Sequence, residues 1–266
     1  MNRPCPRSGI LPANNEMSLK YILLTLVAMA NVIVLASAFN VRAACPGIHA
    51  SSTENVILLH GLCRNSRSWT KMDRALTQAG YTVWNVGYPS RTAPIHILAD
   101  EAIGPAITNC LQAGATKIDF VTHSMGGILV RSYLARHQVP ELGRVVMLNP
   151  PNQGSEIVDK LGSLALFRWI TGPAGDELGT GTNSTPNQLG PAKFPVGIIA
   201  GDRSINWINS LFFLPGRDDG KVTVARAKLA GMSDFKVLHV AHSFVTYNPE
   251  VIRLTIQFLQ TGKFGA

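Results

Sequence analysis

The stretch DFVTHSMGG (residues 119–127) decides the fold of this chain. Its first half is an apolar run typical of a buried strand, and its end opens an apolar helical segment. Ser124 stands at the turn between them, as the serine of a nucleophile elbow does. The elbow pattern is Gly-x-Ser-x-Gly, but Thr122 replaces the first glycine. Because Gly126 and Gly127 keep the later side of the turn small, we predict that Ser124 is a nucleophile. The alternative is an ordinary helix N-cap serine.

Short apolar runs alternate with helical periods from residue 50 onward. We predict strands at residues 56–60, 81–86, 118–122, 145–149, 196–200 and 235–240. We predict helices at about residues 67–79, 95–113, 125–137 and 249–260. Strands that are apolar throughout are typical of strands buried on both faces. The alternation therefore predicts an α/β fold with a doubly wound, mostly parallel sheet and helices on both faces.

Groups suited to catalysis follow several of the predicted strands. Active sites of such sheets gather at the carboxyl ends of the strands. Ser124 follows the third predicted strand, Asp202 the fifth and His242 the last. The first predicted strand ends in His-Gly-Leu. We expect the backbone N–H groups of Leu62 and Met125 to form an oxyanion hole for a tetrahedral intermediate.

Five segments of the chain carry a family resemblance. They are VILLHGL (56–62), THSMGGILVRSYL (122–134), MLNPPNQGSEIVD (147–159), DDGKVTV (218–224) and VAHSF (240–244). With these motifs in this order, the chain resembles the α/β-hydrolase superfamily, and within it the bacterial lipases and esterases. The resemblance implies a Ser–Asp–His triad that cleaves carboxylic esters through an acyl-enzyme, with no metal and no organic cofactor. Amidase, thioesterase or transacylase activity on the same site is the alternative, and a non-catalytic binding protein of this fold is a third hypothesis.

The resemblance also implies the other two triad members. It matches the acid to Asp219, in the segment DGKVTV, and the base to His242, in the segment VAHSF. The neighbouring Asp218 and the more distant Asp202 are alternative acids, and His239 is the alternative base.

Apolar side chains gather between the fifth predicted strand and the acid segment. In SINWINSLFFLPG (204–216), we predict that Trp207, Phe212 and Phe213 bind the substrate, although packing into the core would explain them equally well. Residues 155–195 combine an apolar helical part at residues 157–170 with a loop rich in Gly, Thr and Asn at residues 171–191, which predicts a small cap or lid. The expected substrate is a small-molecule or lipid ester.

The N-terminal residues 1–44 stand apart from the rest of the chain. Residues 22–39 carry no charge, follow Lys20 and end in small residues, as a secretory signal peptide does. Met17 is then the expected true start. The same run is also near the length of a membrane anchor. We therefore predict a secreted or periplasmic protein, or one anchored by residues 22–39, with the catalytic domain at residues 45–266.

Charge and cysteine usage limit the partners. The formal net charge is +8, but the Lys and Arg residues are scattered, so the sequence does not support nucleic-acid binding. Contact with an anionic membrane surface is compatible with this charge. No Cys/His spacing is typical of a metal site. We predict a disulfide between Cys45 and Cys110 at the amino edge of the sheet, with Cys63 free at the opposite edge.

Overall fold

The computed structural model describes residues 54–205, 210 and 213–265. The predictions for residues 1–44, including the signal peptide or anchor at residues 22–39 and the start at Met17, lie outside this part of the chain. Within the described part, no helix has both the length and the apolar character to cross a membrane.

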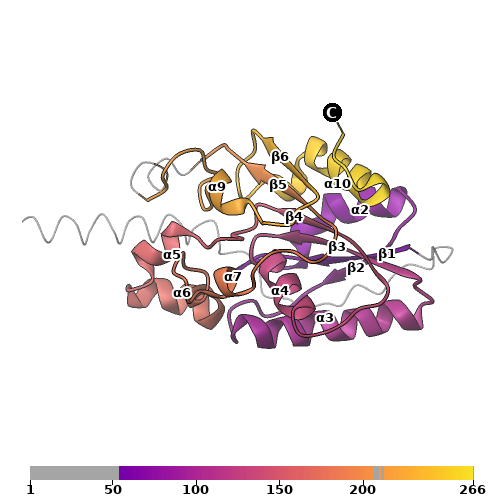
Figure 1. Cartoon of the computed structure of the whole chain (residues 1–266), viewed down its shortest axis with the longest axis horizontal. Helices are drawn as coiled ribbons and strands as arrows, with labels where there is room; N and C mark the ends of the chain where they lie inside the picture. The colour runs from indigo at the N-terminus through magenta and orange to yellow at the C-terminus, as the bar shows by residue number, and fades with distance from the viewer. Residues whose placement is uncertain (1–53, 206–209, 211–212, 266) are drawn as a thin grey trace, which may run out of the picture. The chain divides into compact units, whose positions relative to one another are not determined.

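Six strands form one parallel sheet, shown edge-on in Figure 1. They are β1 (Glu54–Leu59), β2 (Thr82–Val86), β3 (Lys117–His123), β4 (Leu142–Leu148), β5 (Val196–Gly201) and β6 (Asp234–Leu238). Their order across the sheet is β2-β1-β3-β4-β5-β6, and every neighbouring pair is parallel. The predicted fold class is confirmed, and each predicted strand lies within three residues of the observed bounds.

Helices cover both faces of the sheet (Figure 1). One face carries α3 (Ile95–Gln112) and α4 (Met125–Leu134), and the other carries α2 (Thr70–Gln78) and α10 (Pro249–Thr261). Successive side chains of a strand point to opposite faces, so Leu58 and Leu59 of β1 enter different cores. Burial of one such leucine contributes about 1.5–3 kcal/mol to stability.

The shorter elements connect this framework. They are the 3-10 helices η1 (Ser66–Trp69) and η2 (Val245–Tyr247), and the helices α5 (Glu156–Leu161), α6 (Ala165–Asp176), α7 (Thr185–Gln188) and α9 (Val224–Ala227). The sequence predicted an apolar helical part that ends at residue 170, followed by a loop. Instead, α5 and α6 share this segment, and α6 continues past a kink at Gly172, where φ is 65° and ψ is −173°.

Candidate active site

Ser124 occupies the sharp turn between β3 and α4. Its φ of 54° and ψ of −124° are rare for a residue with a side chain, and such strain persists only where surrounding contacts enforce it. The N–H of Ser124 donates to the Leu148 carbonyl across 2.9 Å, and the Ser124 carbonyl accepts from the Gly127 N–H across 3.0 Å. Strand β4 and the first turn of α4 therefore hold the serine in this conformation.

Glycines allow the elbow to approach the end of β1. A Cβ atom on Gly126 would lie 2.5 Å from the Leu59 carbonyl oxygen, a separation that backbone atoms do not tolerate. A Cβ atom on Gly61 would lie 3.0 Å from the Cβ of Ser124. The side chain of Thr122, in contrast, is buried, and its hydroxyl donates to the Val146 carbonyl over 3.4 Å. The fold thus accommodates the replacement of the first elbow glycine.

His242 and Asp219 form a buried pair. The Nδ1 of His242 donates to Oδ2 of Asp219 across 2.7 Å, which leaves Nε2 as the acceptor of the neutral ring. The backbone N–H of His242 also donates to the Asp219 carbonyl, at 3.0 Å. The second carboxylate oxygen accepts from the backbone N–H groups of Lys221 (2.9 Å) and Val222 (2.8 Å). These bonds fix the carboxylate and orient the imidazole.

His123 connects this pair to the elbow. Its Nε2 donates to the His242 carbonyl across 3.1 Å, and the centroids of the two rings lie 4.8 Å apart. Because Ser124 is the next residue after His123, the base and the elbow serine belong to one cluster. In the described part of the chain, no hydrogen bond joins Oγ of Ser124 to His242, so the cluster is assembled without that contact.

Burial lowers the pKa of the histidines of this cluster and so favours their neutral form. It is the main cause that lowers the pKa of His242; the Asp219 carboxylate opposes this effect, and the cations Lys221 and Arg64 reinforce it. Burial also holds the pKa of His123 well below its ordinary value. A neutral His242 is able to accept a proton.

His60 at the end of β1 is structural. Burial lowers its pKa to about 4. Its Nδ1 donates to the Gly61 carbonyl across 2.9 Å, its Nε2 accepts from the Tyr88 N–H at 3.3 Å, and the ring stacks on Tyr88 with centroids 4.1 Å apart. This ring supports the loop that contacts the elbow.

The alternative acids have other partners. Asp218 accepts from the Ser210 hydroxyl and from the Gly220 N–H, both at 2.7 Å. Asp202 accepts from Arg217 and, across 3.0 Å, from the exposed His239. The structure therefore brings Asp219, and neither alternative, to His242.

The two expected oxyanion donors border the elbow. Met125 is the first residue of α4, so its N–H has no acceptor within the helix. Leu62 is half-buried and follows Gly61, which touches Ser124. Among the described residues, no acceptor takes a hydrogen bond from the Leu62 N–H. The assignment of both groups to an oxyanion hole stays a prediction.

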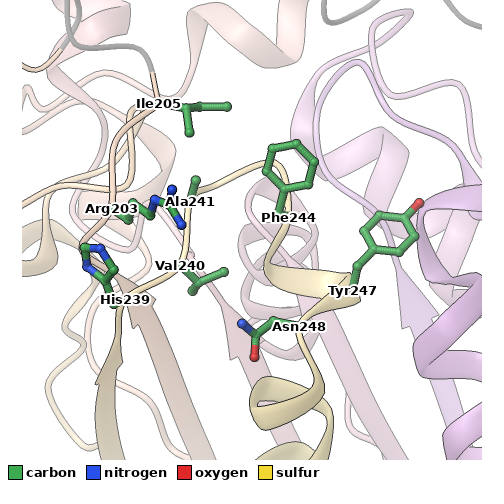
Figure 2. A pocket seen from close by; sticks show the side chains of 8 residues that line it. All are labelled: Arg203, Ile205, His239, Val240, Ala241, Phe244, Tyr247 and Asn248. Carbon is green, nitrogen blue, oxygen red and sulfur yellow. The ribbon is translucent and has the colours of Figure 1, made fainter.

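The predicted substrate-binding residues are only partly within the described chain. Trp207 and Phe212 lie outside it, and Phe213 is half-buried. A pocket of about 290 Å³ lies between the end of β6 and the residues of η2, and Figure 2 shows the side chains that line it. Its lining includes Ala241, which precedes His242, and the exposed Ile205 and Phe244. Sequence reasoning missed these two side chains, although Phe244 stands two residues after His242 in the motif VAHSF.

The segment between β4 and β5 contacts the loops at the carboxyl edge of the sheet. The Ile170 carbonyl in α6 accepts from Arg91 across 3.0 Å and from the Cys63 thiol across 3.5 Å. The Ile95 N–H donates to the Glu177 carboxylate just after α6, at 3.0 Å. These contacts join the predicted cap, residues 155–195, to the loops that follow β1 and β2.

Neither a metal cluster nor a disulfide is formed by the described residues. No group of three or more His, Cys, Asp or Glu residues in this part could hold a metal ion. Cys63 and Cys110 are free thiols. Cys45 lies outside the described residues, so its disulfide with Cys110 stays a prediction.

Several solved structures share the fold of this chain. A lipase from Bacillus licheniformis, BlEst2 in its mature form, is 20% identical with a TM-score of 0.63; the match covers 77% of this chain and 91% of the lipase. Phospholipase PlaB from Legionella pneumophila is 18% identical with a TM-score of 0.62, covering 80% of this chain and 60% of the phospholipase. A metagenomic carboxyl esterase, MGS0156, is 19% identical with a TM-score of 0.57; the match covers 74% of this chain and 66% of the esterase.

At such identities, these likenesses show the fold alone. No curated protein matches the sequence. The family model for the alpha/beta hydrolase fold matches residues 54–186, which is half of the chain. The chain therefore belongs to the α/β-hydrolase family.

Proposed function

We propose that this protein is a serine hydrolase that cleaves carboxylic esters, with Ser124 as nucleophile, His242 as base and Asp219 as acid. One observation carries the proposal: His242 and Asp219 share a buried hydrogen bond of 2.7 Å, and His123 links this pair to the strained serine of the elbow. A structural histidine would need neither a carboxylate partner nor this position beside a serine held at positive φ.

The chemistry follows from this arrangement. Nε2 of His242 takes the hydroxyl proton of Ser124 while Oγ attacks the ester carbonyl carbon, and Asp219 stabilises the imidazolium. The oxyanion of the tetrahedral intermediate accepts from the N–H groups of Leu62 and Met125. The intermediate collapses to an acyl-enzyme, and the leaving alcohol takes the proton from His242. Water, deprotonated by His242, then releases the carboxylic acid and restores Ser124.

The apolar surroundings support an ester with an apolar acyl group. Ile205 is 53% exposed and Phe244 is 56% exposed, and both line the pocket of Figure 2, whose other lining residues include Ala241, the residue before His242. The names of the structural neighbours, which include a lipase, a phospholipase and an esterase, agree with such a substrate. The exposed Trp169 and Leu166 of α6 suit a second role for the proposed cap at residues 155–195, which is contact with a lipid surface.

Turnover of 4-nitrophenyl esters with acyl chains of two to twelve carbons tests the proposal. We expect ester hydrolysis by the full chain and its complete loss in Ser124→Ala. The matched control is Ser233→Ala, which removes a serine just before β6, at the amino ends of the strands and away from Ser124. Undiminished hydrolysis in Ser124→Ala would refute the mechanism. Amide or thioester turnover without ester turnover would instead favour an amidase or a thioesterase, and acyl transfer to an added alcohol in place of water would favour a transacylase.

A further inference from the structure

Two cations flank the Asp219–His242 pair, and the proposed mechanism uses neither of them. Arg64 follows the loop after β1 and is half-buried. Its Nη2 donates to the Ser243 carbonyl across 3.0 Å, so the guanidinium is held against the residue next to the base. Within the described chain this is the only hydrogen bond of the guanidinium, which has five N–H donors.

Lys221 reaches the same cluster from the acid segment. Its N–H donates to Oδ1 of Asp219 across 2.9 Å, and its carbonyl accepts from the Ser155 hydroxyl across 2.8 Å. Hydrogen bonds therefore hold both its backbone N–H and its backbone carbonyl, and the residue is half-buried. In the part of the chain that the structure describes, the Lys221 ammonium makes neither a hydrogen bond nor an ion pair. It is still close enough to Arg64, Cys63 and Asp219 for electrostatic interaction.

Among the described residues, Asp219 is the one carboxylate that acts on both Lys221 and His242, and the neighbouring Asp218 accepts from Ser210 and Gly220 instead. Hydrogen bonds already engage both oxygens of the Asp219 carboxylate, one with His242 and one with two backbone N–H groups. Burial lowers the pKa of Lys221 and of Arg64. Arg64 lowers the pKa of Lys221 further, and both cations lower the pKa of His242. Half-buried cations that lack an anionic partner are unfavourable, and a bound anion would relieve that cost.

We propose that Arg64 and Lys221 form an anion subsite beside the triad, and that the enzyme prefers esters that carry a carboxylate or a phosphate near the scissile bond. This inference rests on the proposed function and specifies its substrate class. The apolar part of the substrate would lie against Ile205 and Phe244 in the pocket of mixed lining, while the two cations take the charged group. The amphiphilic substrate would thus be oriented at both ends.

Matched ester pairs test the subsite in the full chain. One pair is 4-nitrophenyl pentanoate and mono-4-nitrophenyl glutarate, in which a terminal methyl is replaced by a carboxylate. The other is 1-butyrylglycerol and 1-butyrylglycerol 3-phosphate, in which the alcohol carries a phosphate. We expect the wild-type protein to show a higher kcat/KM for the charged member of at least one pair. The pair with the larger preference identifies the anion.

Substitution of the cations should reduce this preference. We expect Lys221→Met to lower kcat/KM for the charged ester about tenfold more than for its neutral partner, and Arg64→Met to have a similar effect. Arg64→Lys keeps the charge if Arg64→Met fails to fold. Lys71→Met and Arg74→Met, on the exposed side of α2, are charge-matched controls that should leave both constants unchanged.

The failures of the two proposals are distinguishable. A wild-type protein that hydrolyses only the neutral esters would overturn the subsite and leave the esterase mechanism intact. An equal loss for both esters in Lys221→Met, with the acid limb of the pH profile moved upward, would also overturn it, because Lys221 would then act only on His242. Persistent turnover in Ser124→Ala would overturn the mechanism itself.

Discussion

Two Asp–His pairs lie at the carboxyl ends of the strands, and they differ in the properties that the proposed catalytic dyad needs. Both pairs have short contacts: Nδ1 to carboxylate oxygen is 2.7 Å for His242–Asp219 and 3.0 Å for His239–Asp202. The side chains of the first pair are 6% and 2% exposed, whereas His239 is 75% and Asp202 11% exposed. The pairing alone therefore does not separate a proposed active site from a surface ion pair.

The surroundings make the difference. Asp219 is held by two backbone N–H groups, which cannot move away, and the ring of His242 packs against His123 beside the elbow. Asp202 shares its carboxylate with the exposed Arg217, in a position where water and salt screen the interaction. A preorganised dyad thus depends on fixed backbone donors and on exclusion of water more than on the length of one hydrogen bond.

The largest expected effect comes from Asp219→Asn. The amide removes the charge that stabilises the imidazolium and favours the wrong tautomer of His242, so kcat should fall about 10⁴-fold. The matched variant Asp202→Asn should stay within about threefold of wild type, because it changes only the screened pair. Steady-state ester hydrolysis measures both. A large loss in Asp202→Asn with activity retained in Asp219→Asn would reverse the assignment of the acid.

The next effect concerns stability in acid. The pKa of His60 is about 4 in the folded protein and 6.5 when unfolded, so its contribution to stability is present above pH 6.5 and is lost as the pH falls toward 4. The loss is about 3 kcal/mol, and His123 and His242 add to it in the same direction.

Urea unfolding between pH 7.5 and 4.5 measures this loss. We expect His60→Gln to flatten part of the pH dependence, even though it lowers the stability at neutral pH. A slope that is the same in wild type and in His60→Gln would contradict the argument.

A smaller effect concerns the pH dependence of activity. His242 must be neutral to accept a proton, and its pKa is lowered, chiefly by burial, with Lys221 and Arg64 reinforcing and Asp219 opposing the shift. As the pH is lowered, kcat/KM should therefore begin to fall only below about pH 6.5. Activity should persist at a pH where an ordinary histidine is already protonated. A limb above pH 7 would show that the charge of Asp219 dominates.

The smallest expected effect is that of Thr122→Gly. The hydroxyl of Thr122 makes a single bond of 3.4 Å to Val146, and the glycines that contact the elbow are unchanged. Activity should stay within about tenfold of wild type, with a loss of about 1 kcal/mol in stability from the extra backbone freedom in β3. Thr122→Ser is the control that keeps the hydroxyl. Abolished turnover in a folded Thr122→Gly protein would reveal a role in catalysis.

The sheet could be predicted closely because its strands are apolar throughout and separated by strong turn residues. The segment 155–195 was harder, since a mixed composition does not reveal that α6 continues through Gly172 to Asp176. Its path depends on tertiary contacts, such as the bond from Arg91 to the Ile170 carbonyl, which no local pattern encodes.

The candidate site was predictable as a set of residue types but not as an arrangement. Order along the chain left Asp219, Asp218 and Asp202 open as acids, because the choice depends on which carboxylate reaches Nδ1 of His242. Arg64 and Lys221 gave no signal of their own, since a scattered cation in a sequence does not reveal whether it folds toward an active site. The catalytic roles of Ser124, Asp219 and His242 and the anion-binding roles of Arg64 and Lys221 stay predictions.

The close contacts around Gly127 bear on which sequence pattern identifies this unusual elbow. A Cβ atom at this position would lie 3.2 Å from the Thr122 hydroxyl and 3.2 Å from the Met147 sulfur. The bulk that Thr122 brings to β3 is therefore matched by a missing side chain five residues later. Positions 122 and 127 should vary together, so that a search signature for this elbow would accept threonine in the first place provided that a second glycine follows Gly126.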